Sequence, residues 1–147
     1  MPMRSKAARI LMVALIGWAT GVLAEDTRQH VELPPMMRDH MLHNMRDHLL
    51  ALQTITRQLS EGDYDGAADT AESRLGMSSM QAHGASHMAP YMPEGMRATG
   101  TAMHQAASRF AVAARNAEVE GGLAKAFGAL SEVMAQCVAC HSQYRVH

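Results

Sequence analysis

The chain has 147 residues, of which 48% are apolar, 18% charged and 4% aromatic, a composition that suits one small globular domain and excludes a disordered or collagen-like chain. Its formal net charge of −1 offers no basic field to nucleic acid, and no uninterrupted apolar run reaches the roughly 18–20 residues of a membrane span. We therefore expect neither nucleic-acid binding nor a membrane-spanning protein. The 14 Met, 9 His and 2 Cys need a chemical or structural account.

Residues 1–24 have the pattern of an export signal. Three cations and no anion open the chain, the mostly apolar segment 10–23 follows, and small or aliphatic residues occupy the −3 and −1 positions of a cleavage site. We predict cleavage before Glu25 and a single periplasmic domain over residues 25–147, with an uncleaved anchor as the alternative. Cleavage removes three cations and takes the net charge from −1 to −4.

Apolar residues at steps of three and four predict four amphipathic helices, and no segment has the period-two alternation of a strand. The helices are expected from Pro34-Pro35 to Gly62, from Asp63 to Gly76, from Pro93-Glu94 to about Ala117, and from Gly121-Gly122 to Tyr144. The connections are short except for one linker, Met77 to Met92. This pattern predicts an all-α fold, an antiparallel four-helix bundle.

The last helix has the strongest periodicity, and it contains Cys137-Val138-Ala139-Cys140-His141. Its expected apolar face consists of Leu123, Phe127, Leu130, Met134, Cys137, His141 and Tyr144. C-x-x-C-H is the attachment motif of a c-type haem, in which each thiol forms a thioether with a vinyl group and the imidazole ligates the iron. The two thiols and the imidazole share one helix face, which we expect to be turned to the interior, so one covalent haem c would lie in the core.

Two cysteines at this spacing have three other common roles in proteins. A thioredoxin-like dithiol requires a preceding strand in a βαβ unit, and a zinc site requires a fourth ligand and usually a second ligand pair. A plain disulfide is the default for two cysteines in an exported protein. The adjacent His141 favours haem over all three.

The C-terminal position of the motif, followed by Ser142-Gln143-Tyr144-Arg145, resembles the cytochrome c prime family and its low-spin relatives. Those proteins carry C-x-x-C-H-x-x-Y-R at the end of the last helix of a four-helix bundle. Members also show an Arg followed four residues later by Leu or Met on the distal side of the iron, a pattern that Arg38 and Leu42 match. The resemblance implies that Arg38 lies near a haem propionate, and a solvated helix arginine is the alternative. It covers the two outer helices, and the Met/His-rich linker departs from it.

The residue at the sixth iron position decides the chemistry. Leu42 cannot ligate iron, so it would leave a five-coordinate haem open to small gases such as nitric oxide or carbon monoxide. Met41 would instead supply a thioether and favour simple electron transfer. Further candidates within two helical turns are Met45, His40, His43 and His48.

The linker region also contains residues that suit copper in an oxidising compartment. They are Met77, Met80, His83, His87, Met88, Met92 and Met96. Their irregular spacing favours ordinary packing of a Met-rich linker over a copper site.

The sequence thus predicts a monohaem c-type cytochrome that carries single electrons, with a haem-based gas binder and a Met/His-rich copper protein as the alternatives. No nucleophile–base pair or carboxylate cluster indicates an enzyme. The expected partner is a redox protein that the sequence does not identify. A homodimer is compatible with the Met/Leu stripe of the first helix and is familiar in the resembling family.

Overall fold

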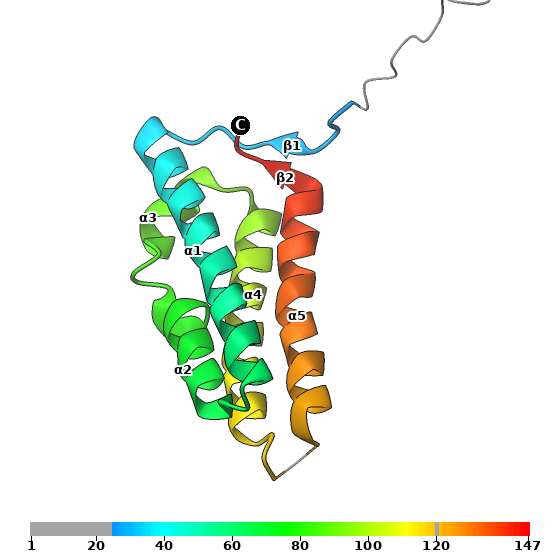
Figure 1. The fold of residues 1–147 in the computed structure, drawn as a ribbon. Helices are drawn as coiled ribbons and strands as arrows, with labels where there is room; N and C mark the ends of the chain where they lie inside the picture. The colour runs from blue at the N-terminus through cyan, green and yellow to red at the C-terminus, as the bar shows by residue number, and fades with distance from the viewer. Residues whose placement is uncertain (1–24, 120) are drawn as a thin grey trace, which may run out of the picture.

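The computed structural model describes residues 25–119 and 121–147, so the predicted export signal lies outside the described residues. Within these ranges the chain is all-α apart from one pair of two-residue strands (Figure 1). The elements in chain order are β1 (Gln29–His30), α1 (Pro35–Ser60), α2 (Tyr64–Arg74), the short 3-10 helix η2 (Met77–Ser79), α3 (Ala85–Met88), the 3-10 helix η3 (Ala89–Tyr91), α4 (Glu94–Arg115), α5 (Gly122–Gln143) and β2 (Tyr144–Arg145).

The four predicted helices are confirmed, and their ends follow the local sequence. Pro35 opens α1 at a position where a missing N–H costs no helical hydrogen bond. Gly62 follows α1 with a φ of +77°, which favours glycine. Asp63 is the predicted N-cap of α2, and its carboxylate accepts a hydrogen bond from the Gly66 N–H at 2.9 Å. The linker is not structureless, because it contains η2, α3 and η3.

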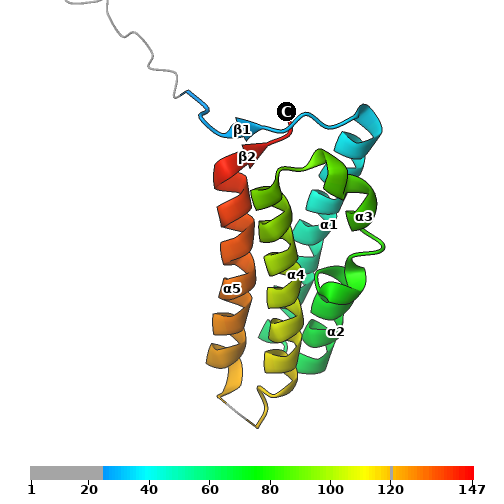
Figure 2. The same ribbon diagram turned by 180° about the vertical axis from the view of Figure 1, so that it is seen from behind.

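Helices α1, α2, α4 and α5 lie side by side and alternate in direction (Figures 1 and 2). Helix α2 packs on both α1 and α4, and α4 packs on α5. The main core contains the fully buried Ile55, Leu59 and Phe110 among many alanines, whose small side chains let the helices approach closely. A second, methionine-rich core lies beside Cys140 and Tyr144.

The buried face of α5 differs from the predicted apolar stripe. Ala126, Leu130 and Val133 are buried, whereas Leu123 and Phe127 are 40% and 41% exposed. The reason is that α5 packs chiefly on α4, so a narrow face that includes the small Ala126 is covered. Among the described residues, α5 alone is long and apolar enough to cross a membrane by length and composition, a test that core helices of soluble proteins also pass.

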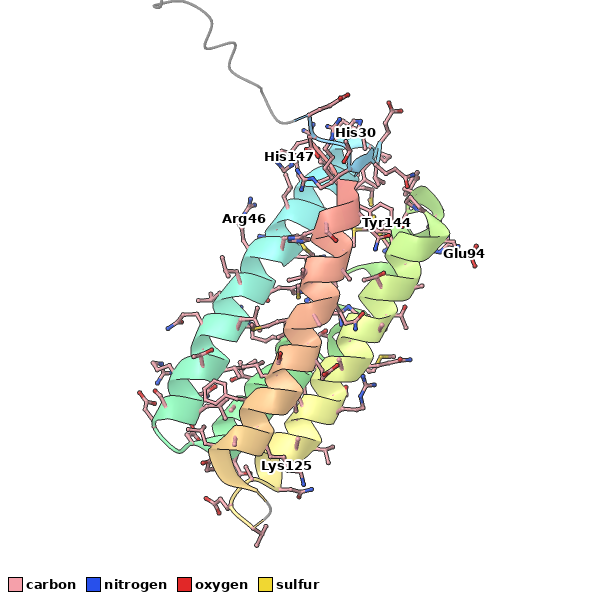
Figure 3. The ribbon with its side chains drawn as sticks, turned by 90° about the vertical axis from the view of Figure 1, so that its right-hand side faces the viewer. His30, Arg46, Glu94, Lys125, Tyr144 and His147 are labelled. Atoms are coloured by element: carbon pink, nitrogen blue, oxygen red, sulfur yellow. The ribbon has the colours of Figure 1, made fainter. Side chains whose placement is uncertain are left out.

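The two short strands join the beginning and the end of the described chain. They run parallel, with Gln29 opposite Tyr144, and the Val31 N–H donates to the Arg145 carbonyl oxygen at 2.8 Å. Tyr144 lies near the start of α4, where Glu94 is found (Figure 3). The pairing was not predicted, because two-residue strands are too short to show a periodic pattern. It places the segment before α1 beside the C-x-x-C-H motif.

Candidate cofactor site

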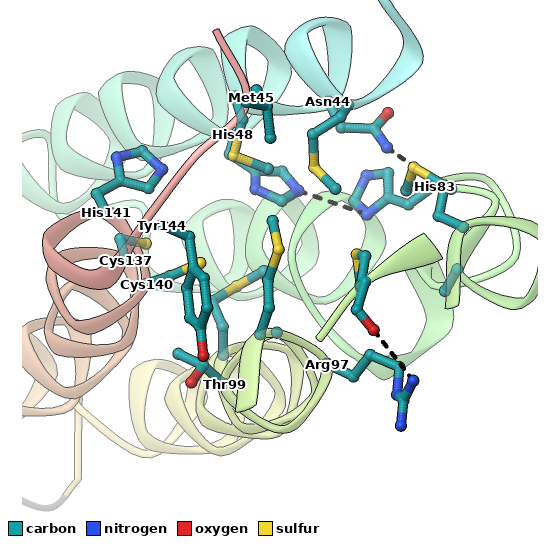
Figure 4. Close-up of a pocket in the computed structure, with 18 of the residues that line it drawn as sticks. Asn44, Met45, His48, His83, Arg97, Thr99, Cys137, Cys140, His141 and Tyr144 are labelled. Atoms are coloured by element: carbon teal, nitrogen blue, oxygen red, sulfur yellow. Dashed lines mark hydrogen bonds between the residues drawn. The ribbon is translucent and has the colours of Figure 1, made fainter. Parts of the chain in front are cut away.

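A pocket of about 890 Å³ opens between α1, the linker, α4 and the C-terminal half of α5 (Figure 4). This volume is that of a cofactor-sized site, and most of the lining is apolar. Seven methionines contribute to the lining: Met41, Met45, Met80, Met88, Met92, Met96 and Met103. Methionine is flexible enough to fill an irregular wall, which makes this lining adaptable to the shape of a bound group.

The three motif residues on α5 line this pocket together. Cys137 and Cys140 are free, half-buried thiols on successive turns of the helix. Burial raises the pKa of both thiols, and the neighbouring Cys137 raises the pKa of Cys140 further. His141 lies at the exposed edge of the pocket, where Arg28 donates from Nη1 to its backbone oxygen at 3.2 Å. The structure therefore brings the predicted haem-attachment residues to one cavity.

Both main candidates for the sixth iron position also line the pocket from α1. Met41 is buried in the methionine-rich core, where it packs with Val31, Met88 and Met96. Leu42 is half-buried in the pocket wall. Two of the further candidates, Met45 and His48, line the pocket, whereas His40 and His43 are not among its lining residues.

Arg38 is not among the lining residues. Its side chain is 46% exposed, and its Nη2 atom lies 3.4 Å from the carboxylate of Asp39. Arg28, Arg97 and Arg145 line the pocket instead, and both Arg28 and Arg145 pair with Asp26. Arg145 is the last residue of the C-x-x-C-H-x-x-Y-R pattern, whereas no pattern in the sequence marks Arg28, which the β1–β2 pairing brings to the same place.

At the rim of the pocket, where Arg28 and Arg145 lie, both arginines pair with the carboxylate of Asp26. The Arg28 side chain donates two hydrogen bonds to Asp26, of 2.8 and 2.7 Å, and they hold the pKa of the Asp26 carboxyl far below its usual value. Arg145 has a buried Nε atom without a hydrogen-bond partner, and its distance to the Asp26 carboxylate is 3.7 Å. One cationic donor at the pocket rim is therefore left unsatisfied.

A cluster of histidines forms the inner wall of the pocket. His48 comes from α1, His83 from the linker and His104 from α4, and their ring centroids lie 4.7 to 6.2 Å apart. Burial, together with the neighbouring His83 and His104, lowers the pKa of His48 to about 4. The pKa of His83 is lowered too, first by burial and then by His104. His48 and His83 are therefore neutral near pH 7.

Sequence reasoning did not find this cluster. In the sequence His48 is a candidate sixth iron ligand, His83 belongs to the candidate copper residues, and His104 stands in no motif. The available signal was weak: His104 directly follows the buried Met103 on the core-facing stripe of α4. A lone histidine at such a position does not reveal its partners.

Only some of the candidate copper-binding residues lie at the pocket. Met80, His83, Met88, Met92 and Met96 line the pocket, whereas Met77 and His87 are exposed and do not. Within the described ranges, no group of three or more His, Cys, Asp or Glu side chains is arranged to hold a metal ion.

Comparison with known proteins gives no family assignment. The chain matches no family model, no curated protein and no solved structure.

Proposed function

We propose that the protein is an exported monohaem c-type cytochrome that carries single electrons. In this proposal Cys137 and Cys140 attach the haem and His141 is its axial ligand. One observation carries it: these three side chains lie on one helix and line one apolar pocket of cofactor size. We further propose that the four packed helices are the antiparallel four-helix bundle of the cytochrome c prime family.

The residues around the pocket fit a haem. The methionine-rich walls suit a large flat apolar group, and Arg28 and Arg145 suit its carboxylates at the rim. The buried Nε of Arg145 lacks a hydrogen-bond partner, and a propionate oxygen would supply one. We assign propionate binding to these two arginines rather than to Arg38, because they line the pocket.

A bound haem supplies an iron that alternates between the ferrous and ferric states and thereby takes up and releases one electron. The chain's own contribution is to hold and shield that iron. His141 provides an imidazole on the same helix as the half-buried thiols of Cys137, one turn before it, and Cys140, directly before it. The apolar walls keep water from the centre of the pocket, which favours the iron state with less net charge.

A redox titration followed by absorbance tests this proposal. Purified holoprotein is expected to show haem bands that change with potential as one component with a one-electron slope. The matched variants are His141→Ala, which removes the axial ligand, and His87→Ala, which removes an exposed histidine that does not line the pocket. A large change of spectrum and potential is expected for His141→Ala alone. No redox-active haem band in the wild type would contradict the proposal.

A second candidate function, binding of a small gas, is favoured by the α1 wall. Leu42 lines the pocket and cannot ligate iron, while the Met41 thioether is packed within an apolar cluster. An open iron would bind carbon monoxide in its ferrous state and show high-spin bands. Low-spin bands in both redox states would exclude this second function and leave the first in place.

A further inference from the structure

Three imidazoles and one hydroxyl form a hydrogen-bonded chain at the inner wall of the pocket. The Nε2 atom of His48 lies 3.4 Å from Nδ1 of His83, as the dashed line in Figure 4 marks. The same Nδ1 atom lies 3.4 Å from Oγ of Ser79, and Nδ1 of His104 lies 3.3 Å from that Oγ. Ser79 is only 2% exposed, so this chain is shielded from bulk water.

Two backbone carbonyls determine the direction of the chain, because a carbonyl oxygen accepts and never donates. His104 Nδ1 lies 2.7 Å from the Leu75 oxygen and therefore carries a hydrogen. The hydroxyl of Ser79 donates to the Gly76 oxygen, also at 2.7 Å. Having given its only hydrogen to Gly76, Ser79 offers lone pairs alone to the neighbouring imidazoles.

The hydrogen positions of the other two rings follow in sequence. His83 Nδ1 faces the Ser79 lone pairs, so we assign it as the donor, with its hydrogen shared between Ser79 Oγ and Nε2 of His48. His48 thus accepts at Nε2. A neutral imidazole has one N–H, so a ring that accepts at Nε2 carries its hydrogen on Nδ1. The hydrogen-bonded chain therefore begins at the backbone oxygens of Leu75 and Gly76 and ends at the Nδ1–H of His48.

Among residues 25–119 and 121–147, that N–H has no acceptor. Within the described residues, the only hydrogen bond of the His48 ring is the one to His83. In Figure 4 the ring lies between His83 and the part of α5 that carries His141, Cys137 and Cys140. His48 is therefore a directed donor in a wall otherwise dominated by methionine side chains, where a hydrogen bond is stronger than in water.

We propose that His48 donates a hydrogen bond to a small ligand bound at the haem iron and so selects ligands whose outer atom is a hydrogen-bond acceptor. This inference rests on the proposed haem site and on an open sixth position. Asn44 supports it as a positioning residue, because its Nδ2 donates to the His83 backbone oxygen at 3.0 Å and holds the middle ring of the chain.

Ligand binding to four holoproteins tests this role: wild type, His48→Leu, His48→Gln and the control His43→Leu, an exposed residue of α1 away from the pocket. The first probe is azide, which binds the ferric protein and whose outer nitrogen accepts hydrogen bonds. The second probe is carbon monoxide, which binds the ferrous protein and is a poor hydrogen-bond acceptor. His48→Leu is expected to weaken azide about tenfold, the size of one hydrogen bond, and carbon monoxide less than about twofold. His48→Gln keeps a donor and most of the azide affinity, and His43→Leu matches wild type.

Two spectroscopic readouts accompany the affinities. The stretching frequency of bound carbon monoxide is expected to rise in His48→Leu alone, because the donor is lost. In the diamagnetic carbon monoxide form, the nitrogen chemical shifts of His48 are expected to report the Nδ1–H tautomer. The Nε2–H tautomer, or equal loss of both ligands in His48→Leu, overturns the proposal.

The outcomes separate this proposal from the proposed function. Absence of covalent haem contradicts both. A low-spin haem that binds neither probe overturns the His48 role and leaves the cytochrome intact. A low-spin haem that becomes high-spin in His48→Leu makes His48 itself the sixth ligand and likewise overturns the donor role.

Discussion

The side-chain amide of Asn44 donates to the backbone carbonyl oxygen of His83 at 3.0 Å, and this buried hydrogen bond joins α1 to the linker that closes the pocket. Asn44→Ala leaves the His83 oxygen without its partner, so we expect a loss of about 1–2 kcal/mol in the free energy of unfolding. Urea denaturation measures this loss. The linker amides of residues 80–92 are also expected to exchange hydrogen faster. The exposed Gln53 on the same helix provides the control Gln53→Ala, and equal stabilities of the two variants would contradict the prediction.

The pH dependence of stability reports the buried His48. Its pKa is about 4 in the folded chain, against an ordinary value of 6.5, so the unfolded chain binds its proton more tightly. Stability is therefore complete above about pH 6.5 and falls as the pH decreases towards 4, by a total on the order of 3 kcal/mol. Denaturation at several pH values measures the slope. His48→Leu is expected to flatten it, and an unchanged slope in this variant would refute the assignment.

Arg74 and Asp47 form a half-buried ion pair that ties α2 to α1 next to the histidine cluster. Two nitrogens of the guanidinium reach the two carboxylate oxygens, and the Arg74 hydrogen bond lowers the pKa of Asp47. Arg74→Ala is expected to cost about 1–2 kcal/mol of stability, because Asp47 then remains half-buried without its cation.

The matched control is the exposed pair of Arg57 and Glu61 on the surface of α1. Arg57→Ala is expected to change the stability by less than about 0.5 kcal/mol, as is usual for surface i,i+4 pairs. Chemical denaturation of both variants provides the comparison. Equal losses would show that the Arg74 pair has no special role.

Two glycines of α4, Gly95 and Gly100, differ in the space that a larger side chain would meet. A Cβ atom at Gly100 would meet open space, so Gly100→Ala is expected to stabilise the helix by about 0.5–1 kcal/mol. A Cβ atom at Gly95 would lie 2.5 Å from the hydroxyl oxygen of Tyr144, so this ring must move. Gly95→Ala is therefore expected to gain less stability and to perturb the haem spectrum. Thermal denaturation and absorbance measure the two effects, and identical gains with identical spectra would argue against the Tyr144 contact.

The helices were predictable because their signals are local. Pro35, Gly62 and Asp63 act through backbone geometry within one turn, and the predicted role of each is confirmed. The shared helix face of Cys137 and Cys140 follows from their spacing alone, and the structure places both in one pocket. The haem itself stays a prediction.

The features that the sequence does not predict depend on contacts between segments that are distant in the chain. Phe127 belongs to the apolar period of α5, yet it is exposed because the covered face is determined by the packing of α4. His48, His83 and His104 meet only after α1, the linker and α4 have packed together, and no period in one segment encodes that meeting. The position of Arg145 beside Arg28 likewise requires the pairing of the two chain ends.

The central claim is covalent attachment of haem to α5, and the intact mass of the exported protein tests it most directly. Wild type produced in cells that attach haem after export is expected to carry the mass of one haem on a chain that begins at Glu25. The Cys137→Ala, Cys140→Ala double variant is expected to lack that added mass. A wild-type chain without haem, or a double variant with haem still covalently attached, would contradict the account.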